Sequence, residues 1–463
     1  MIRYIVFSIL LGLVTNCYSA DVINTELVIS NVDRSIDITT QIVKTTYKIT
    51  LENTGKSPVK SFLFVLEQET KKHVSFISAH TTEGKNLLKI SVTKVQGHDD
   101  KLLWRIDLRD NLAPGKTVGV EVETFLTHNL SPYPAAITQK EKQLILYNGN
   151  SYVFSPYQIN KQTTTVLLGT KNIESYSKLK PVSQSDTNIV YGPYNNIQPF
   201  SFEKLSVHYE NNSPFLTVTQ IERVIEVSHW GNIAIEETIS LEHQGALLKG
   251  SFSRYDYQRE AQSGLSSVKS FKTILPAAAT DAYYRDEIGN ISTSHMRILA
   301  DSVELDLRPR FPLFGGWKTK YTIGYNVPSY EYLYNAGDEF LLKLRIVDHI
   351  FDDMVVDDLT TKIILPEGSK DVHLRTPYPV QRLPDEKHFT YLDIVGRQVV
   401  VLKRNNLVEN HIQDFELSYT FPRVLMLQEP LLAIIGFCAL FLLVIIYVRL
   451  DFSISKHEAK KDD

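Results

Sequence analysis

One acidic run carries the residues best suited to chemistry: Asp348-His349-Ile350-Phe351-Asp352-Asp353, followed by Asp357-Asp358. A histidine with several carboxylates could bind a divalent metal. The spacing lacks the central glycine and terminal glutamate of a calcium loop, and it differs from the H-E-x-x-H pattern of a zinc helix. The sequence also contains no G-x-S-x-G nucleophile elbow. We therefore expect a solvated loop between strands here, and we predict no catalytic residue, no metal and no cofactor.

Three Asn-x-Ser/Thr tripeptides could accept an N-linked glycan, at Asn129, Asn211 and Asn290. The first two are each followed, just past the acceptor serine, by a proline (Pro132 or Pro214) that should impair presentation to the transferase. Asn290 has no such proline and lies in a polar Gly-Asn-Ile-Ser-Thr stretch. We predict that Asn290 is glycosylated and that Asn129 and Asn211 are weaker acceptors.

The composition is that of a globular protein without a basic field. The 463 residues are 43% hydrophobic and 22% charged, and 49 Lys+Arg against 53 Asp+Glu give a formal net charge of −4. Such a balance argues against nucleic-acid binding. The two cysteines, Cys17 and Cys438, both lie in terminal apolar segments. The region between them therefore has no disulfide or cysteine-based site, and it must be stabilised by large ordinary cores.

The first apolar segment has the features of a secretory signal peptide. Arg3 precedes an uncharged run, residues 4–14, and small residues follow at a possible cleavage point. The run is too short to span a membrane, so a retained anchor is disfavoured. We predict a signal peptide over residues 1–19, with cleavage after Ser19.

The second apolar segment, residues 431–448, has no charged residue and would be about 27 Å long as a helix. Arg449 ends it, and a tail with further lysines follows, which places the C-terminus in the cytosol. We predict a single-pass, type I membrane protein with a transmembrane helix over 431–448, a cytosolic tail over 449–463 and its bulk on the lumenal side. Lys460 and Lys461, fourth and third from the C-terminus, resemble a dilysine signal for retrieval to the endoplasmic reticulum.

Between these segments, apolar and polar residues alternate with the period of half-buried strands. Examples are residues 47–52, 104–108 and 342–346. Turn signals separate the strands, including Pro114-Gly115, Asn148-Gly149 and Pro366-Glu367-Gly368. Convincing amphipathic helices are scarce. The pattern predicts a mainly β fold of antiparallel sandwiches, in which the aromatic run 311–334 packs as structure or faces a partner and is not a glycan platform.

Internal similarity indicates that the outer region is a duplication. Four segments recur in the same order, and each match alone is weak because strand patterns resemble one another by chance. We predict two tandem related lumenal β domains, residues 20–210 and 211–430. The matched pairs are Val32–Thr39 with Ile221–Ser228, Ile49–Gly55 with Ile239–Gly245, Val166–Leu168 with Ile363–Leu365, and Leu205–Tyr209 with Phe415–Tyr419.

Several runs together resemble the ribophorin I family, whose members are the first subunit of the oligosaccharyltransferase complex. The resemblance covers the signal, both lumenal halves, the span and the residues that follow it. The long aromatic run is its most specific part. The runs are Ile137-Thr138-Gln139, Ser155-Pro156-Tyr157, Phe252–Gln258 (FSRYDYQ), Arg310–Thr319 (RFPLFGGWKT), Gly324–Tyr334 (GYNVPSYEYLY), Val424–Leu431 (VLMLQEPL) and Tyr447–Ile454 (YVRLDFSI).

The resemblance implies membership of the complex that moves a preassembled glycan from dolichyl diphosphate to Asn in Asn-x-Ser/Thr of nascent chains. In that family the transfer belongs to a different, multi-pass subunit, so this chain would be a non-catalytic accessory in the endoplasmic reticulum membrane. Its implied partners are the other subunits, including the catalytic one, with the translocon and nascent polypeptide nearby. Some relatives carry a long cytosolic domain that contacts the ribosome. Here only residues 449–463 follow the span, so ribosome contact is doubtful.

Two other functions stay open from the residues alone. One is a lumenal enzyme with an unrecognised site on a sandwich scaffold, which fold class does not exclude. The other is a single-pass adhesion or receptor protein built from β-sandwiches. The disulfide-free domains and the C-terminal lysines argue against the second alternative.

Overall fold

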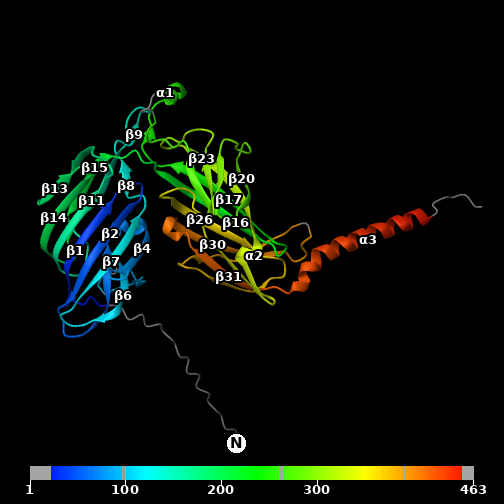
Figure 1. The fold of residues 1–463 in the computed structure, drawn as a ribbon, viewed down its shortest axis with the longest axis horizontal. Helices are drawn as coiled ribbons and strands as arrows, with labels where there is room; N and C mark the ends of the chain where they lie inside the picture. The colour runs from blue at the N-terminus through cyan, green and yellow to red at the C-terminus, as the bar shows by residue number, and fades with distance from the viewer. Residues whose placement is uncertain (1–21, 96, 99–100, 260–263, 391, 451–463) are drawn as a thin grey trace, which may run out of the picture. The chain divides into compact units, whose positions relative to one another are not determined.

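The chain forms two compact units in the computed structural model, which describes residues 22–95, 97–98, 101–259, 264–390 and 392–450 (Figure 1). Unit 1 comprises Met1–Pro134 and Gln143–Ser213, and unit 2 comprises Ala135–Lys142 and Pro214–Asp463. The predicted cleavage site at Ser19 and the tail lysines Lys460 and Lys461 lie outside the described residues.

The mainly β fold predicted from the alternating pattern is confirmed. Strand β2 (Val43–Asn53) buries Tyr47, Ile49 and Leu51 and turns the residues between them outward. Strand β25 (Glu339–Arg345) buries Leu342 and Leu344 in the same way. Alternation of this kind places one face of each strand against a core and leaves the other toward solvent.

Unit 1 contains a seven-stranded sheet, a four-stranded sheet and a three-stranded sheet. The seven-stranded sheet has the order β13 (Val182–Ser185), β14 (Asn188–Ile197), β11 (Ile159–Leu167), β1 (Leu27–Asp37), β2, β7 (Thr117–Leu126), β4 (Val74–Thr81). The four-stranded sheet has the order β12 (Ile173–Tyr176), β15 (Lys204–Glu210), β10 (Leu144–Asn150), β8 (Leu130–Pro132). The small sheet has the order β3 (Val59–Leu66), β6 (Leu102–Leu112), β5 (Lys89–Thr93), and the 3-10 helix η1 (Gln68–Lys72) follows β3.

Unit 2, like unit 1, contains one large sheet and several smaller sheets. Its large sheet has the order β20 (Thr280–Asp286), β23 (Lys318–Pro328), β17 (Asn232–His243), β16 (Leu216–Val227), β26 (Val355–Ile364), β30 (Arg397–Leu407), β28 (Gln381–Arg382), with β29 (Glu386–His388) also on β30. The others are β24 (Leu333–Ala336)-β25-β31 (Asp414–Thr420)-β27 (Lys370–Arg375), β19 (Phe271–Pro276)-β22 (Ser302–Leu307)-β21 (His295–Ile298), and β18 (Leu247–Leu248)-β9 (Ala136–Ile137).

The large sheets of the two units share one strand order and one register. Each has a parallel pair at the same place, β1 with β11 and β16 with β26, while the remaining neighbours pair antiparallel. Arg34 on β1 lies opposite Tyr47 and Thr164, and Arg223 on β16 lies opposite Glu237 and Thr361. The segments matched by sequence therefore lie in corresponding strands. The predicted boundaries at residues 20–210 and 211–430 stay a prediction.

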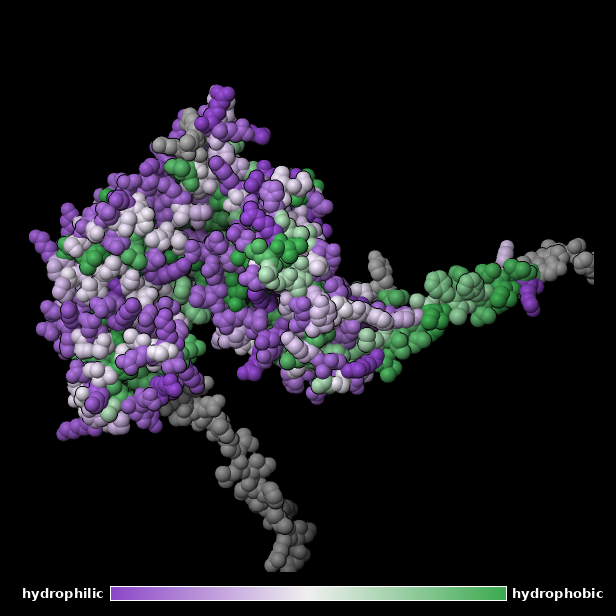
Figure 2. Space-filling view, in the orientation of Figure 1, coloured by the Kyte–Doolittle hydropathy of each residue, from purple (hydrophilic) through white to green (hydrophobic). Residues whose placement is uncertain are grey.

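Helices are few in the described part of the chain. Besides η1, they are α1 (Arg254–Arg259), α2 (Ser329–Tyr332), η2 (Glu409–His411), η3 (Arg423–Leu427) and α3 (Gln428–Arg449). Helix α3 is apolar, and Arg423–Arg449 is long enough to cross a membrane by length and composition. It contains the predicted span 431–448. Figure 2 shows the hydrophobic surface of α3 along its length.

An aromatic cluster in unit 2 accounts for the start of the run 311–334. The ring of Trp317 lies 5.3 Å from that of Phe314, 5.7 Å from Phe252 and 5.8 Å from Phe311, measured between centroids. The backbone of this segment also lies very close to Ala246. Only glycine fits at position 315, because a Cβ there would lie 1.9 Å from the carbonyl oxygen of Ala246. Edge-to-face ring pairs of this kind add packing energy beyond their buried area. The cluster supports a structural role for this segment.

Replacing Trp317 by alanine should lower the free energy of unfolding by about 2 kcal/mol, since a half-buried ring and its aromatic contacts are lost. The matched control is Trp230→Ala, because Trp230 is 64% exposed. That change should stay within about 0.5 kcal/mol. Denaturant unfolding of the purified full chain measures both. Equal losses in the two variants would contradict a packing role for Trp317.

Candidate functional site

The acidic run at 348–353 does not form the solvated loop that we expected. Asp348, Ile350 and Phe351 are buried, and His349 is mostly buried, whereas Asp352 is exposed. The prediction was wrong for Asp348 because its carboxylate has a buried cationic partner, Arg223, that is distant in sequence. A charge of this kind is held in a core only when it is paired and hydrogen-bonded.

Three neighbouring strands assemble the network around Asp348. Arg223 on β16 donates from Nη1 to Asp348 Oδ2 at 2.7 Å and also to the carboxylate of Glu237 on β17. Tyr325 on β23 donates its hydroxyl to Asp348 Oδ2. Because β16, β17 and β23 are adjacent in the sheet, their inward positions carry these side chains to one point. Asp348 follows β25 of the opposing sheet, so the network ties the two layers of unit 2 together.

Burial and the neighbouring charges of the network together set the pKa of Glu237. Two carboxylates share one guanidinium in a fully buried place, and the Glu237 Oε2 atom has no hydrogen-bond partner. Burial, opposed by Arg223 and reinforced by Asp348, raises the pKa of Glu237 from 4.5 to about 7. A protonated Glu237 lets the cluster remain neutral inside the core. Burial likewise raises the pKa of the Tyr325 hydroxyl well above its usual value.

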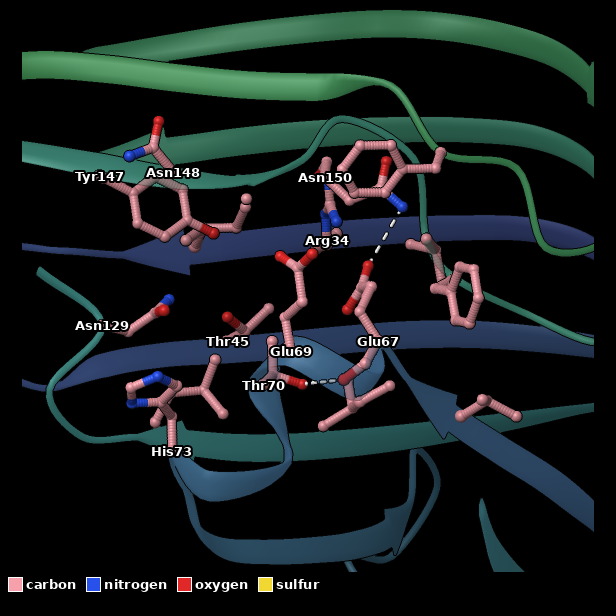
Figure 3. Close-up of a pocket in the computed structure, with 18 of the residues that line it drawn as sticks. Arg34, Thr45, Glu67, Glu69, Thr70, His73, Asn129, Tyr147, Asn148 and Asn150 are labelled. Atoms are coloured by element: carbon pink, nitrogen blue, oxygen red, sulfur yellow. Dashed lines mark hydrogen bonds between the residues drawn. The ribbon is translucent and has the colours of Figure 1, made fainter. Parts of the chain in front are cut away.

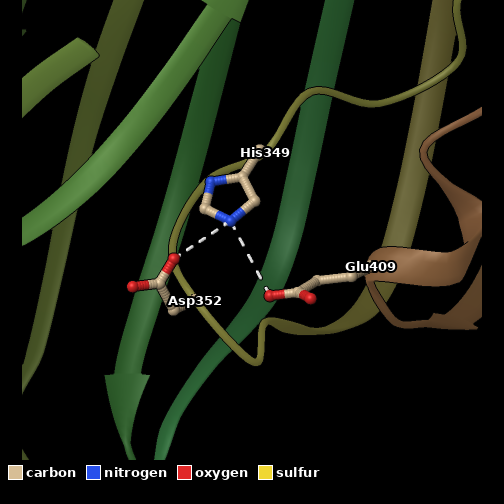
Figure 4. A group of neighbouring side chains, drawn as sticks. All are labelled: His349, Asp352 and Glu409. Atoms are coloured by element: carbon tan, nitrogen blue, oxygen red, sulfur yellow. Dashed lines mark ion pairs between the residues drawn. The ribbon is translucent and has the colours of Figure 1, made fainter.

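A second group brings His349 and Asp352 together with Glu409 of η2, a residue that the sequence pattern did not single out (Figure 4). His349 Nε2 lies 3.3 Å from Asp352 Oδ1 and 3.7 Å from Glu409 Oε1. One nitrogen and two carboxylate oxygens within 4.8 Å of one another could hold a divalent cation. Burial lowers the pKa of His349, but the carboxylates of Glu409 and Asp352 outweigh it and raise the pKa overall. The same contacts form ion pairs when the imidazole is protonated, and a protonated imidazole is not a metal ligand.

Unit 1 contains a cavity of about 630 Å³ between its sheets (Figure 3). Arg34 and Tyr47 line it from the large sheet, Tyr147 and Asn150 line it from β10, and residues 67–73 close one side. Figure 3 shows the side chains of Glu67 and Glu69 extending from this side toward Arg34 and Asn150. Asn150 Nδ2 donates to Glu67 Oε1 at 3.1 Å.

Several polar groups that line this cavity form hydrogen bonds with the protein itself. The Thr70 hydroxyl donates to the Glu67 carbonyl at 2.6 Å, and His73 Nδ1 lies 2.9 Å from the Thr127 carbonyl. Burial lowers the pKa of His73. Burial, opposed by Arg34, raises the pKa of Tyr147 to about 12. Thr70 and His73 are therefore not arranged as a nucleophile and its base.

The three glycan acceptors differ in exposure. Asn290 is exposed and directly follows the turn 286–289 after β20. Asn129 is half-buried and lines the cavity of unit 1. Asn211 is buried, and its Nδ2 donates to the Thr39 carbonyl at 3.2 Å. An attached glycan must project from the folded surface, so the exposure of Asn290 supports its choice as the main acceptor, which stays a prediction.

Comparison with known proteins shows the family. A family model described as Ribophorin I matches residues 27–448. The chain belongs to the ribophorin I family. It is 48% identical over 434 residues to dolichyl-diphosphooligosaccharide–protein glycosyltransferase subunit 1 of Caenorhabditis elegans, covering 93% of this chain and 74% of that protein. It is 39% identical over 441 residues to subunit 1B of Arabidopsis thaliana, covering 93% and 94%.

Solved structures give only a weak likeness. An M1 zinc metallopeptidase from Deinococcus radiodurans matches with a TM-score of 0.26 at 10% identity, covering 44% of this chain and 42% of that one. A likeness at this level carries no argument about function. The family membership of this chain follows from its similarity in sequence to members of the ribophorin I family.

Three charged members of these groups, Arg223, Glu237 and Glu409, were missed by sequence reasoning, although the first two had a signal. Glu237 lies between Ile235 and Ile239 in an alternating strand, and Arg223 lies between Ile221 and Ile225. Charged residues at inward positions of two strands predict a buried pair. Glu409 offers no such signal, since only the tertiary fold brings it beside His349.

Glu237→Gln should flatten the pH dependence of stability. In the folded state this carboxyl keeps its proton above pH 4.5, where the unfolded chain loses it, so folding takes up a proton. The resulting stabilisation is present at low pH and is lost as pH rises through about 7. Thermal unfolding of the full chain between pH 5 and 8 measures the effect. The matched control, Glu236→Gln, changes the neighbouring, partly exposed carboxylate and should keep the slope. An unchanged slope in Glu237→Gln contradicts the assignment.

Proposed function

We propose that this chain is a non-catalytic subunit of the oligosaccharyltransferase complex, which transfers a preassembled glycan from dolichyl diphosphate to Asn of Asn-x-Ser/Thr. The observation that carries the proposal is the similarity over 93% of the chain to relatives named subunit 1 of that glycosyltransferase. The chain would support assembly of the complex and delivery of its substrates. Its partners would be the other subunits, including the catalytic one, with the translocon and the nascent polypeptide nearby.

A supporting role is consistent with the state of the charged groups. Arg223, Glu237 and Asp348 are fully buried and bind one another, so they serve the core. His349 is paired with carboxylates. A catalytic site would also need a nucleophile or an acid–base pair placed to reach a substrate. The proposal assigns the glycosyl transfer to another subunit.

The proposed topology is that of a type I protein of the endoplasmic reticulum membrane. The signal peptide 1–19 is cleaved after Ser19, domains 20–210 and 211–430 lie in the lumen, residues 431–448 span the bilayer, and 449–463 form the cytosolic tail. The apolar helix α3 supports the span. The shared strand order of the two large sheets supports a duplication. Lys460 and Lys461 would serve as the retrieval signal.

The decisive experiment purifies the tagged full chain in mild detergent, as wild type and as the triple variant His349→Gln, Asp352→Asn, Glu409→Gln. Both should bring the other oligosaccharyltransferase subunits, and glycan transfer by the two complexes should agree within about twofold, because these side chains form an internal ion pair. A complex of unchanged composition whose transfer falls by orders of magnitude would establish a catalytic role. Absence of the other subunits would refute membership of the complex.

Asn290 should carry the main glycan, since it is the exposed acceptor of the three. The protein purified from cells should shift in mobility after treatment with a glycosidase that removes N-linked glycans, and Asn290→Gln should abolish that shift. Asn129→Gln is the matched control and should leave the shift nearly intact. A shift of full size in Asn290→Gln would disprove the assignment.

A further inference from the structure

The base of helix α3 is fixed to the body of unit 2 by polar contacts. Arg397 Nη2 donates to Glu429 Oε1 at 3.0 Å, and Gln428 donates to the carboxylate of Glu367. Just before the helix, Arg423 Nη2 donates to the Gly337 carbonyl at 3.1 Å. Leu425 and Met426 of η3 pack against the hydrophobic core of the unit. The helix therefore leaves unit 2 from a defined place (Figure 1).

Exposed apolar side chains surround this base. We call five of them the apolar rim. They come from the turn between β16 and β17, from the loop before β30 and from η3. Each is between 61% and 77% exposed, which is unusual for side chains of this type gathered in one place. The rim consists of Trp230, Phe389, Ile394, Val395 and Val424.

Side-chain and backbone contacts place the rim loops beside the first turn of α3. Trp230 lines a small cavity of about 80 Å³ together with Glu367, Gln428 and Glu429. The backbone N–H of Ile394 donates to Glu367 Oε1 at 2.8 Å, and the N–H of Val395 donates to the same oxygen. Glu367 thus joins the loop before β30 to the helix start, and the rim lies at one end of unit 2.

The polar groups of the loop before β30 are turned inward. The Thr390 N–H donates to Asp393 Oδ2 at 2.7 Å, and the Asp393 side chain is 0% exposed and pairs with Arg397 at 3.3 Å. Glu367 accepts three successive N–H groups, those of residues 394–396. Because the amides of Thr390 and of residues 394–396 have partners within the protein, these parts of the loop can enter a medium of little water at low cost.

We propose that the apolar rim lies in the interfacial layer of the bilayer and holds unit 2 against the membrane surface. The inference rests on the proposed function, in that α3 spans the membrane. The span begins at Leu431, only about 3 Å along the helix axis from Glu429. The polar interface of a bilayer is roughly 5 to 7 Å thick on each side. Glu367 and Arg397, which bond to Gln428 and Glu429, therefore lie close to that depth, and Glu367 holds the loop before β30 there.

A lipid partner accounts for the rim better than a protein partner does. Tryptophan is enriched where its ring is apolar and its N–H remains wet, as in the interface. The rim is continuous with the span, so insertion of α3 brings the five side chains to the lipid without any further partner. Burying them there removes apolar surface from water, which opposes tilting of the unit on its single helix.

The test uses nitroxide labels on the full chain reconstituted alone in phosphatidylcholine nanodiscs. Single cysteines are placed at Val395 or Phe389 in a chain without its native cysteines, and accessibility to oxygen is compared with accessibility to a water-soluble nickel complex. The matched control is Ile288→Cys, which is 82% exposed in the wild type but follows the β20 end that pairs with Tyr321. Measured along strand β23, Ile288 is separated from the apolar rim by roughly 20 Å.

The oxygen-to-nickel ratio at Val395 and Phe389 should be several-fold above that at Ile288, as for a site in the interface. A separate chain that keeps Cys438 as its single cysteine is labelled there to test the span. If Cys438 reports the bilayer interior while both rim labels report water, the rim proposal fails and the span stands. If Cys438 also reports water, the proposed topology fails. Rim labels that are wet in nanodiscs and become shielded only in the assembled complex would assign the rim to a protein partner and overturn the proposal.

Discussion

A buried arginine that joins two sheets is the constraint on which each unit is built. In unit 2, Arg223 holds Asp348 from the opposing layer and Glu237 from the neighbouring strand. In unit 1, Arg34 at the corresponding position donates from Nη2 to the carbonyls of Asn150 and Ser151, at 2.8 and 2.6 Å. Removing one partner of a buried pair leaves an uncompensated charge and costs about 3 to 5 kcal/mol, so the pairing sets how the layers align.

The same constraint explains where the cavities lie. Arg34 donates to the backbone carbonyls of residues 150–152, where β10 ends. Arg223 donates to Asp348, in the segment that follows β25. Each guanidinium with its partners occupies space between the two layers, next to a cavity. Arg34 lines the cavity of about 630 Å³ in unit 1, and Arg223 with Asp348 lines one of about 390 Å³ in unit 2. The two arginines are bound differently, because Arg34 donates to uncharged backbone carbonyls whereas Arg223 donates to two carboxylates.

The sequence predicts the strands well and the tertiary pairs poorly. Alternation at residues 47–52 is decided by local burial, so the pattern is sufficient there. Asn148-Gly149 has the form of a turn but lies inside β10, where a Cβ on Gly149 would come within 2.4 Å of the Tyr147 hydroxyl. That glycine is required by a neighbouring ring, which local rules do not contain. Similarly, the fate of Asp348 depends on Arg223, more than a hundred residues away.

Strand β16 connects the buried core of unit 2 to the helix base. It carries Arg223 at its centre and Glu226 near its end, and Glu226 Oε1 accepts from Arg397 Nη1 at 2.8 Å. Arg397 also binds Glu429 at the start of α3. One guanidinium thus bridges a strand fixed by the core and a helix that is apolar along its length. Because each group on this path has a fixed partner, the direction in which α3 leaves unit 2 follows from the packing of the sheets. A loop that held the helix without such pairs would leave that direction free.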